Sequence, residues 1–290
     1  MQISKSSELE YKTEGIYWRP YLVKLFNHTT LMLFTLIIIY PVVWMVLASF
    51  KTSGEFVDNI WGIPSVLDID NYHRAWELAN LGRALINSLI ISLGTVALVI
   101  ALSSIAGYAF AKFRFRFSAL ILLVLIFTMQ APTPVIPFYV LFVRLDLTDS
   151  YVGLILGIAS GSLPLSIFIF QAFFRSIPNE LREAAKIDGC SEFSAFLRVV
   201  MPISGPAVAT VAILTFVGAW NEYFLPLLLV RSPEIRPLTL AVQVFFFQYG
   251  RVEWTDVFAA LSIASIPMIV LYVILQRWFI QGLTSGSIKG

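Results

Sequence analysis

Long runs of apolar residues, separated by shorter polar segments, dominate the chain from about residue 30 onward. A helix needs about 20 mostly apolar residues to cross the hydrocarbon core of a bilayer. Six runs meet this length, so the pattern predicts an all-α integral membrane protein with six transmembrane helices. The expected spans are 30–50, 85–111, 119–143, 151–174, 204–230 and 257–280.

Composition supports lipid as the main solvent of this chain. Of the 290 residues, 58% are hydrophobic and 13% are charged, whereas soluble domains carry about a quarter charged residues. Cys190 is the single cysteine and His28 and His73 are the two histidines. An internal disulfide is therefore excluded, and we expect no metal site built from cysteine or histidine.

The polar segments divide the chain into an N-terminal arm (1–29), a membrane domain (30–281) with a long polar loop at 175–203, and a C-terminal tail (282–290). The arm contains Glu8, Glu10 and Glu14 and lacks the features of a secretory signal. Lysine and arginine gather in the loops on one side of the spans, in the arm, at 112–116 and at 175–203. By the positive-inside rule, we expect both termini to be cytoplasmic.

Two spans contain unusual residues. Gly153, Gly157 and Gly161 form a small-residue face on the fourth span. Close packing of helices is the favoured interpretation of this face, ahead of a role in transport. In the third span, Gln130 precedes a proline-rich segment that includes Pro134. Irregular backbone at membrane depth indicates either a pathway lined by this segment or a kinked helix buried among neighbours, and both remain open.

The fifth span carries Trp220, Asn221 and Glu222. An ionisable side chain inside a span is costly and usually faces the bundle interior or water. Counting about 1.5 Å per residue from Gly205, Glu222 is expected about 25 Å along the helix. Together with Gln130, these three residues are candidates for a translocation pathway. An interfacial tryptophan beside a glutamate that caps a loop is an equally good interpretation.

The loop at 175–203 alternates charged and apolar residues at helical spacing, unlike an ordinary polar loop. We expect a short helix over 178–186 with Asn179 as its N-cap, a sharp turn at Gly189, and a second helix over 191–200 closed by Pro202. Two short helices joined by a tight turn would form a compact element for docking against a partner.

The sequence Glu183-Ala184-Ala185-x-x-Asp188-Gly189, with Pro202 downstream, resembles the coupling loop of membrane subunits of ATP-binding-cassette importers. The segments at 63–76, 87–92, 106–115, 220–227 and 282–290 are similar to carbohydrate permeases of the maltose type, in particular the six-span partner. The resemblance implies that this loop docks onto a cytoplasmic ATPase dimer. It also implies a second permease subunit as heterodimer partner and an extracytoplasmic sugar-binding protein.

The resemblance therefore implies a permease subunit of a sugar importer in a bacterial or archaeal plasma membrane. ATP would be bound by the partner, and no cofactor is expected on this chain. The sequence has no G-x-x-x-x-G-K-[ST] phosphate loop and no plausible catalytic triad, which argues against an enzyme. An ion-coupled secondary transporter is the main alternative, but we find no paired repeats. A membrane enzyme would need clustered histidine, aspartate or cysteine at the lipid boundary, which the sequence lacks, and a channel would leave residues 178–206 unexplained.

Overall fold

The computed structural model describes residues 19–130, 134–247 and 252–285, and this part of the chain is helical without a strand. The predicted arm and tail lie partly outside it. The helices are α2 (Arg19–Ala48), α3 (Ser53–Asp58), α4 (Asp70–Leu78), α5 (Leu81–Lys112), α6 (Ser118–Gln130), α7 (Val135–Arg144), α8 (Tyr151–Ser176), α9 (Asn179–Ile187), α10 (Glu192–Ala195), a π-helical turn η1 (Phe196–Val200), α11 (Met201–Ile203), α12 (Gly205–Trp220), α13 (Phe224–Leu229), a 3₁₀ turn η2 (Pro233–Ile235), α14 (Leu238–Ala241), α15 (Val244–Phe247) and α16 (Trp254–Ser285).

Four helices are long and apolar enough to cross a membrane, and two broken helix pairs raise the number to six. The second, fourth and sixth predicted spans correspond to α5, α8 and α16. The third is divided into α6 and α7 around residues 131–133, which lie outside the described residues and include Pro132. The prediction of one continuous fifth helix over 204–230 was wrong, because α12 ends at Trp220 and α13 begins at Phe224.

The centre of the molecule is the packing of α5 on α8, with α12 against both. Gly107 of α5 allows a close approach of the two helices. A Cβ at this position would lie 2.6 Å from the Cβ of Phe170 and 3.0 Å from the backbone nitrogen of Gln171, both on α8. Because lipid gives helices no hydrophobic reason to associate, such close contact supplies much of the packing energy.

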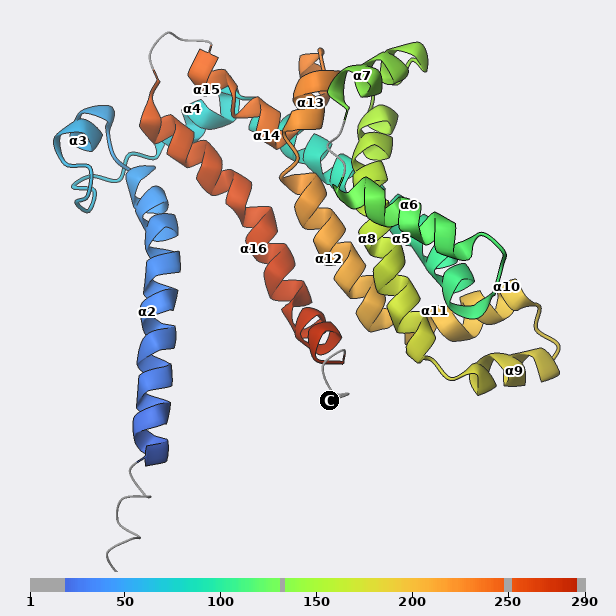
Figure 1. The fold of residues 1–290 in the computed structure, drawn as a ribbon. Helices are drawn as coiled ribbons and strands as arrows, with labels where there is room; N and C mark the ends of the chain where they lie inside the picture. Colours follow the sequence, from blue (N-terminus) through green and yellow to red (C-terminus); the bar gives the residue numbers. More distant parts are fainter. Residues whose placement is uncertain (1–18, 131–133, 248–251, 286–290) are drawn as a thin grey trace, which may run out of the picture.

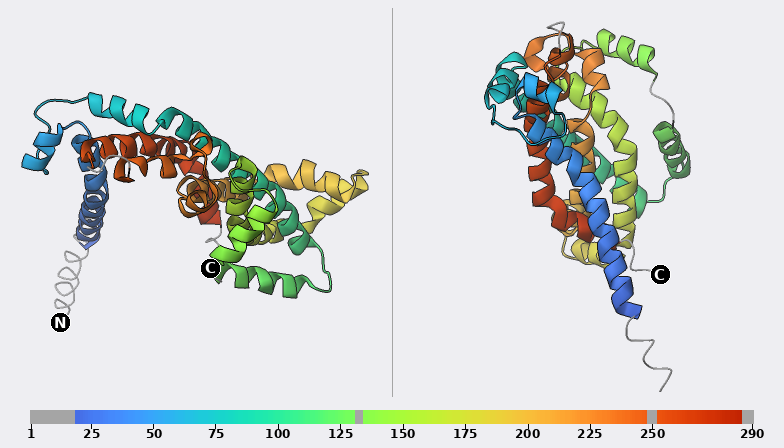
Figure 2. Two further views of the ribbon diagram at one scale, coloured as in Figure 1. Left: turned by 90° about the horizontal axis from the view of Figure 1, so that it is seen from above. Right: turned by 90° about the vertical axis from the view of Figure 1, so that its left-hand side faces the viewer.

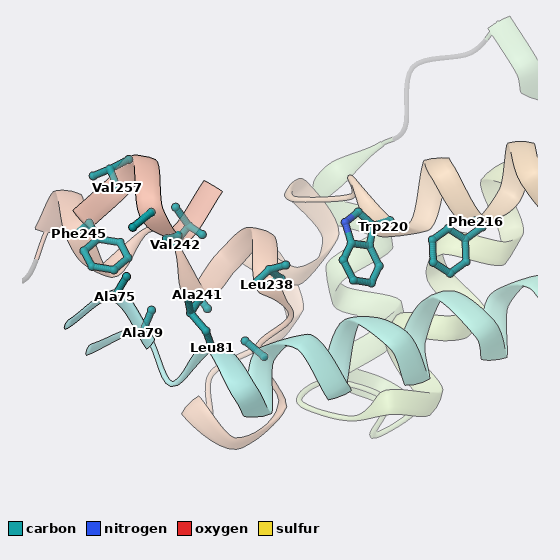
Figure 3. Close-up of a cluster of buried hydrophobic side chains, with 13 residues drawn as sticks. Ala75, Ala79, Leu81, Phe216, Trp220, Leu238, Ala241, Val242, Phe245 and Val257 are labelled. Atoms are coloured by element: carbon teal, nitrogen blue, oxygen red, sulfur yellow. The ribbon is translucent and has the colours of Figure 1, made fainter. Parts of the chain in front are cut away.

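At one end of the bundle, α4, α14 and α15 cover the start of α16 (Figure 1). Their buried side chains, together with Leu81 of α5 and with Phe216 and Trp220 of α12, form the apolar cluster in Figure 3. Leu81 and Leu238 in this cluster are each 1% exposed or less. A charged contact reinforces the cluster, since the Arg74 guanidinium lies 3.0 Å from the carboxylate of Asp256, which is itself buried. We call this the cap end.

The helix α2 stands apart from the bundle (Figures 1 and 2). It reaches the rest of the chain near Ala48, where the ring of Trp44 lies 5.2 Å from that of Phe258 on α16. Most of its apolar side chains are exposed. The first residues of α2, the last turns of α16 and the helix α9 lie at the end opposite the cap (Figure 1).

Candidate functional site

The predicted docking loop folds as two helices joined by a tight turn, on the side of the molecule away from α2 (Figures 1 and 2). α9 ends at Ile187, and Gly189 follows with φ = +82°, a left-handed conformation that suits glycine. The backbone nitrogen of Cys190 donates to the carbonyl of Ala185 at 2.9 Å, which closes the turn. The Ser191 hydroxyl then accepts from the nitrogen of Ser194 and caps α10.

Two details of this loop differ from the sequence prediction. Pro178, not Asn179, occupies the N-cap position of α9, and Asn179 Oδ1 instead accepts a hydrogen bond from Lys112. The second helix continues through η1 and α11 to Ile203, so Pro202 lies inside its last turn. The chain then bends by 78° into α12. The bend follows Pro202 by two residues and so joins the docking loop directly to the fifth span.

The loop is fastened to the bundle from its inner side. Lys112, the last residue of α5, donates to the carbonyl of Ile177 at 2.7 Å and to Asn179 Oδ1 at 3.0 Å. Phe196 and Val200 are 3% and 1% exposed and join the core formed with α5, α8 and α12. These contacts attach the loop to three spanning helices, α5, α8 and α12.

The outer side of the loop is exposed and partly apolar. Ile187 is 87% exposed and Phe193 is 60% exposed. Most residues of the predicted motif lie on the exposed surface, while Ala185 is buried at 7% exposure. The exposed members are Glu183, Ala184, Asp188, Gly189 and Pro202. We call the exposed side of α9 and α10 the docking face. Ile187 was not among the predicted site residues, although it directly precedes Asp188 and continues the helical pattern.

A cavity of about 330 Å³ lies between α7, α8, α12 and α13. Its lining combines small and hydroxyl-bearing residues of α8 with Gly218 and Glu222. Of the glycine face predicted on the fourth span, Gly153 packs against the backbone of Leu147, whereas Gly161 has open space where a Cβ would point. Gly153 therefore makes room for the loop just before α8, in which Leu147 lies, and not for another helix. A Cβ at Gly157 would lie within ordinary contact distance of side chains on α7 and α13, and Gly161 lines the cavity. Helix packing through this glycine face stays a prediction.

The four candidate pathway residues are not brought together. Glu222 lines the cavity, and its Oε1 accepts from the nitrogen of Leu225 at 3.0 Å, which caps α13. Trp220 is 4% exposed and stacks on Phe216 with ring centroids 5.6 Å apart. Asn221 is exposed and donates to the carbonyl of Val217 in its own helix. Gln130 is exposed at the end of α6.

The glutamate cap also explains why the fifth span is broken. Glu222 directly follows Asn221, the C-cap of α12, and its carboxylate accepts a hydrogen bond from the first turn of α13, which stabilises the start of the second helix. Pro226, inside α13, lacks the backbone N–H that a continuous helix would use. The sequence interpretation of Glu222 as a capping residue thus describes its contact, while its position on the cavity wall keeps the pathway interpretation open.

The described residues contain no group of three or more histidine, cysteine or acidic side chains that would hold a metal ion.

The chain is similar in sequence and in fold to known transport proteins. A family model described as "Binding-protein-dependent transport system inner membrane component" matches residues 99–285. The diacetylchitobiose uptake system permease protein of Streptomyces coelicolor is 31% identical over 266 residues, which cover 91% of this chain and 88% of that protein. The sulfoquinovosyl glycerol transport system permease protein of Agrobacterium fabrum is 35% identical over 255 residues, covering 87% and 89%.

The fold is similar to that of a solved bacterial ABC transporter involved in the import of the acidic polysaccharide alginate. The TM-score is 0.80 with 23% sequence identity, and the match covers 89% of this chain and 97% of that chain. At 23% sequence identity, this similarity is evidence for a shared fold and not for a shared function.

Proposed function

The chain belongs to the family of binding-protein-dependent transport system inner membrane components, and from this premise we propose that it forms half of the pathway of an ATP-driven sugar importer. The family match covers residues 99–285, and the apolar helices make it a multi-pass membrane protein. It is a transport subunit and not a catalytic enzyme. The alternative of an ion-coupled secondary transporter receives no support from the relatives, which are named as permease proteins of an uptake system and of a transport system.

A carbohydrate substrate is supported by two relatives that are named for diacetylchitobiose and for sulfoquinovosyl glycerol. The cavity between α8 and α12 suits a sugar, because the Ser160 and Ser162 lining and the Glu222 carboxylate offer partners for hydroxyl groups. We assign Glu222 to the pathway and leave Trp220 as a packing residue. Asn221 and Gln130 would reach a sugar only if the helices rearranged during transport.

The docking face is the observation that carries the coupling proposal. An anchored helix pair with exposed Ile187 and Phe193 is costly in water and suits burial in a cleft of another protein. We assign this cleft to a cytoplasmic ATPase subunit, which would bind the ATP, so this chain would need no cofactor. Motion of the ATPase dimer would move α9 and α10, and through them the spans that bound the cavity.

The same proposal predicts the orientation of the chain in the membrane and the subunits with which it assembles. The ends of α2 and α16 lie at the same end as the docking face (Figure 1), so both termini would be cytoplasmic in a bacterial or archaeal plasma membrane. The cap end would then face outward and receive the sugar-binding protein through the loops at 51–84 and 231–256. A second permease subunit would complete the pathway as a heterodimer.

The test is purification of the tagged chain from its native membrane in a gentle detergent, followed by identification of the proteins that accompany it. We expect an ATP-binding subunit and a second permease. The companion binding protein can then be screened for its sugar by calorimetry. A chain that purifies without an ATPase under the mildest conditions would contradict the proposal.

A further inference from the structure

One carboxylate connects both docking helices to a spanning helix. Glu192 is the first residue of α10. Its Oε2 lies 2.5 Å from Lys186 Nζ, and its Oε1 lies 3.3 Å from Arg182 Nη1, both on α9. The same Oε1 accepts a hydrogen bond from the Tyr108 hydroxyl of α5 at 2.7 Å. Both oxygens are therefore used, and a single side chain joins α9, α10 and α5.

The α5 side of this connection is enclosed. Tyr108 is 5% exposed, and its ring centroid lies 4.9 Å from that of Phe196 and 5.8 Å from that of Phe174. One turn further along α5, Lys112 holds the start of α9. A tyrosine packed in this way cannot follow Glu192 by rotating its side chain, because its ring is held by aromatic neighbours from two other helices.

A movement of α9 would accordingly displace α5 instead of being taken up by rotation of the Tyr108 side chain. Of the groups that bind Glu192, Tyr108 is buried, Arg182 is half-buried and Lys186 is exposed, whereas Ile187 of the docking face is 87% exposed. Surface ion pairs contribute little, but this group is partly shielded, with Arg182 and Glu192 side chains 19% and 27% exposed. The hydrogen bond from Tyr108 adds a directional contact that a simple ion pair lacks.

We propose that Glu192 and Tyr108 are positioning residues of coupling, through which displacement of the docking helices enters α5 and reaches the packed α5–α8–α12 centre. The proposal rests on the proposed docking of α9 onto an ATPase. It assigns the transmission step to a contact between residues 84 positions apart in the sequence, separate from the docking face itself.

The test uses Y108F and E192Q in the complete importer, reconstituted in vesicles. Phenylalanine keeps the ring packing and removes the hydroxyl, and glutamine keeps hydrogen bonding and removes the charge that binds Lys186 and Arg182. We measure sugar uptake per ATP hydrolysed, on complexes isolated through the ATPase subunit. We expect full recovery of the ATPase, retained ATP hydrolysis, and a several-fold lower ratio of uptake to hydrolysis in both variants.

Y151F is the matched control. In the wild type, the Tyr151 hydroxyl donates to Oδ1 of Asn87 on α5 at 2.6 Å. The substitution therefore removes a similar hydrogen bond to the same helix, near the cap end. We expect its uptake ratio to equal that of the wild type. The double variant Y108F/E192Q should lose little more than the stronger single variant, because the two residues share one contact.

Three results would overturn this proposal. They are an unchanged ratio in both variants, an equal fall in Y151F, or loss of the ATPase from the complex, which would make the contact merely structural. An unchanged ratio in an intact complex would leave the proposed function standing. Failure of the wild-type chain to recover an ATPase would remove both proposals.

Discussion

The docking face on α9 and α10 and the cavity between α7, α8, α12 and α13 differ in the side chains that they expose. At the docking end, charged side chains such as Lys112 and Glu192 turn inward to fasten the loop, and apolar Ile187 is left exposed. At the cavity, the polar side chains of Ser160, Ser162 and Glu222 line the space together with apolar ones such as Phe138 and Leu225. A surface that presents apolar groups suits a protein partner, whereas a hollow that offers polar groups at membrane depth suits a hydrated solute.

The largest effect is expected from a substitution at Ile187 on the docking face. Replacing Ile187 by Asp puts a charge where we expect an apolar cleft, and burial of one isoleucine contributes about 1.5–3 kcal/mol. Recovery of the ATPase with the tagged chain should fall by roughly tenfold or more. I63D is the matched control, since Ile63 is 77% exposed in the loop before α4. Equal recovery of the ATPase with I187D and wild type would remove Ile187 from the interface.

Filling the cavity should leave docking intact and obstruct transport. Gly161 lines the cavity and has open space at its Cβ position. We expect G161L to lower uptake by roughly tenfold, equivalent to about 1.4 kcal/mol in the barrier. G161A, which adds one methyl group, should retain most of the uptake. Wild-type uptake by G161L with a normally recovered ATPase would show that the cavity is not on the pathway.

A substitution at Glu222 distinguishes its role in capping α13 from a role in contacting the substrate. Glutamine retains an oxygen that accepts from the nitrogen of Leu225, so E222Q should keep the start of α13. A charged hydrogen-bond partner is about twice as strong as a neutral one, so we expect uptake to fall about threefold. N221A is the control, because Asn221 bonds to its own helix. A loss with N221A and none with E222Q would move the pathway to another side of α12.

The smallest expected effect is a pH dependence at the cap end. Asp149 accepts hydrogen bonds from the Ser232 hydroxyl, from the Ser232 nitrogen and from the Arg231 nitrogen, and these hold its pKa below the ordinary value. A depressed pKa contributes stability that is complete above the unfolded value of about 3.9 and is lost as pH falls through the folded value.

We therefore expect D149N to lower the melting temperature of the purified complex at pH 7, with a difference that shrinks as the pH falls below about 4. D146N is the matched control, since Asp146 and Asp149 have nearly the same backbone φ, 54° and 53°, and asparagine tolerates this conformation. A constant difference at every pH, or an equal change in D146N, would contradict the role of the Asp149 carboxylate.

Features set by local sequence were predicted well. The spans α5 and α8 follow from apolar length, and the turn at Gly189 follows from the need for a positive φ. The break after Trp220 was missed because Asn221 and Glu222 interrupt the apolar run only briefly, and apolar residues follow again from Phe224. The Tyr108–Glu192 contact was also missed, because it depends on how distant helices pack and leaves no periodic signal.

The most direct test of the coupling claim is a photo-crosslinking residue at Ile187, with the same residue at Ile63 as reference, in the complex assembled in its native membrane. The account predicts an adduct with the ATP-binding subunit from position 187 and none from position 63. An assembled complex that gives no adduct from position 187, or equal adducts from both positions, would contradict it.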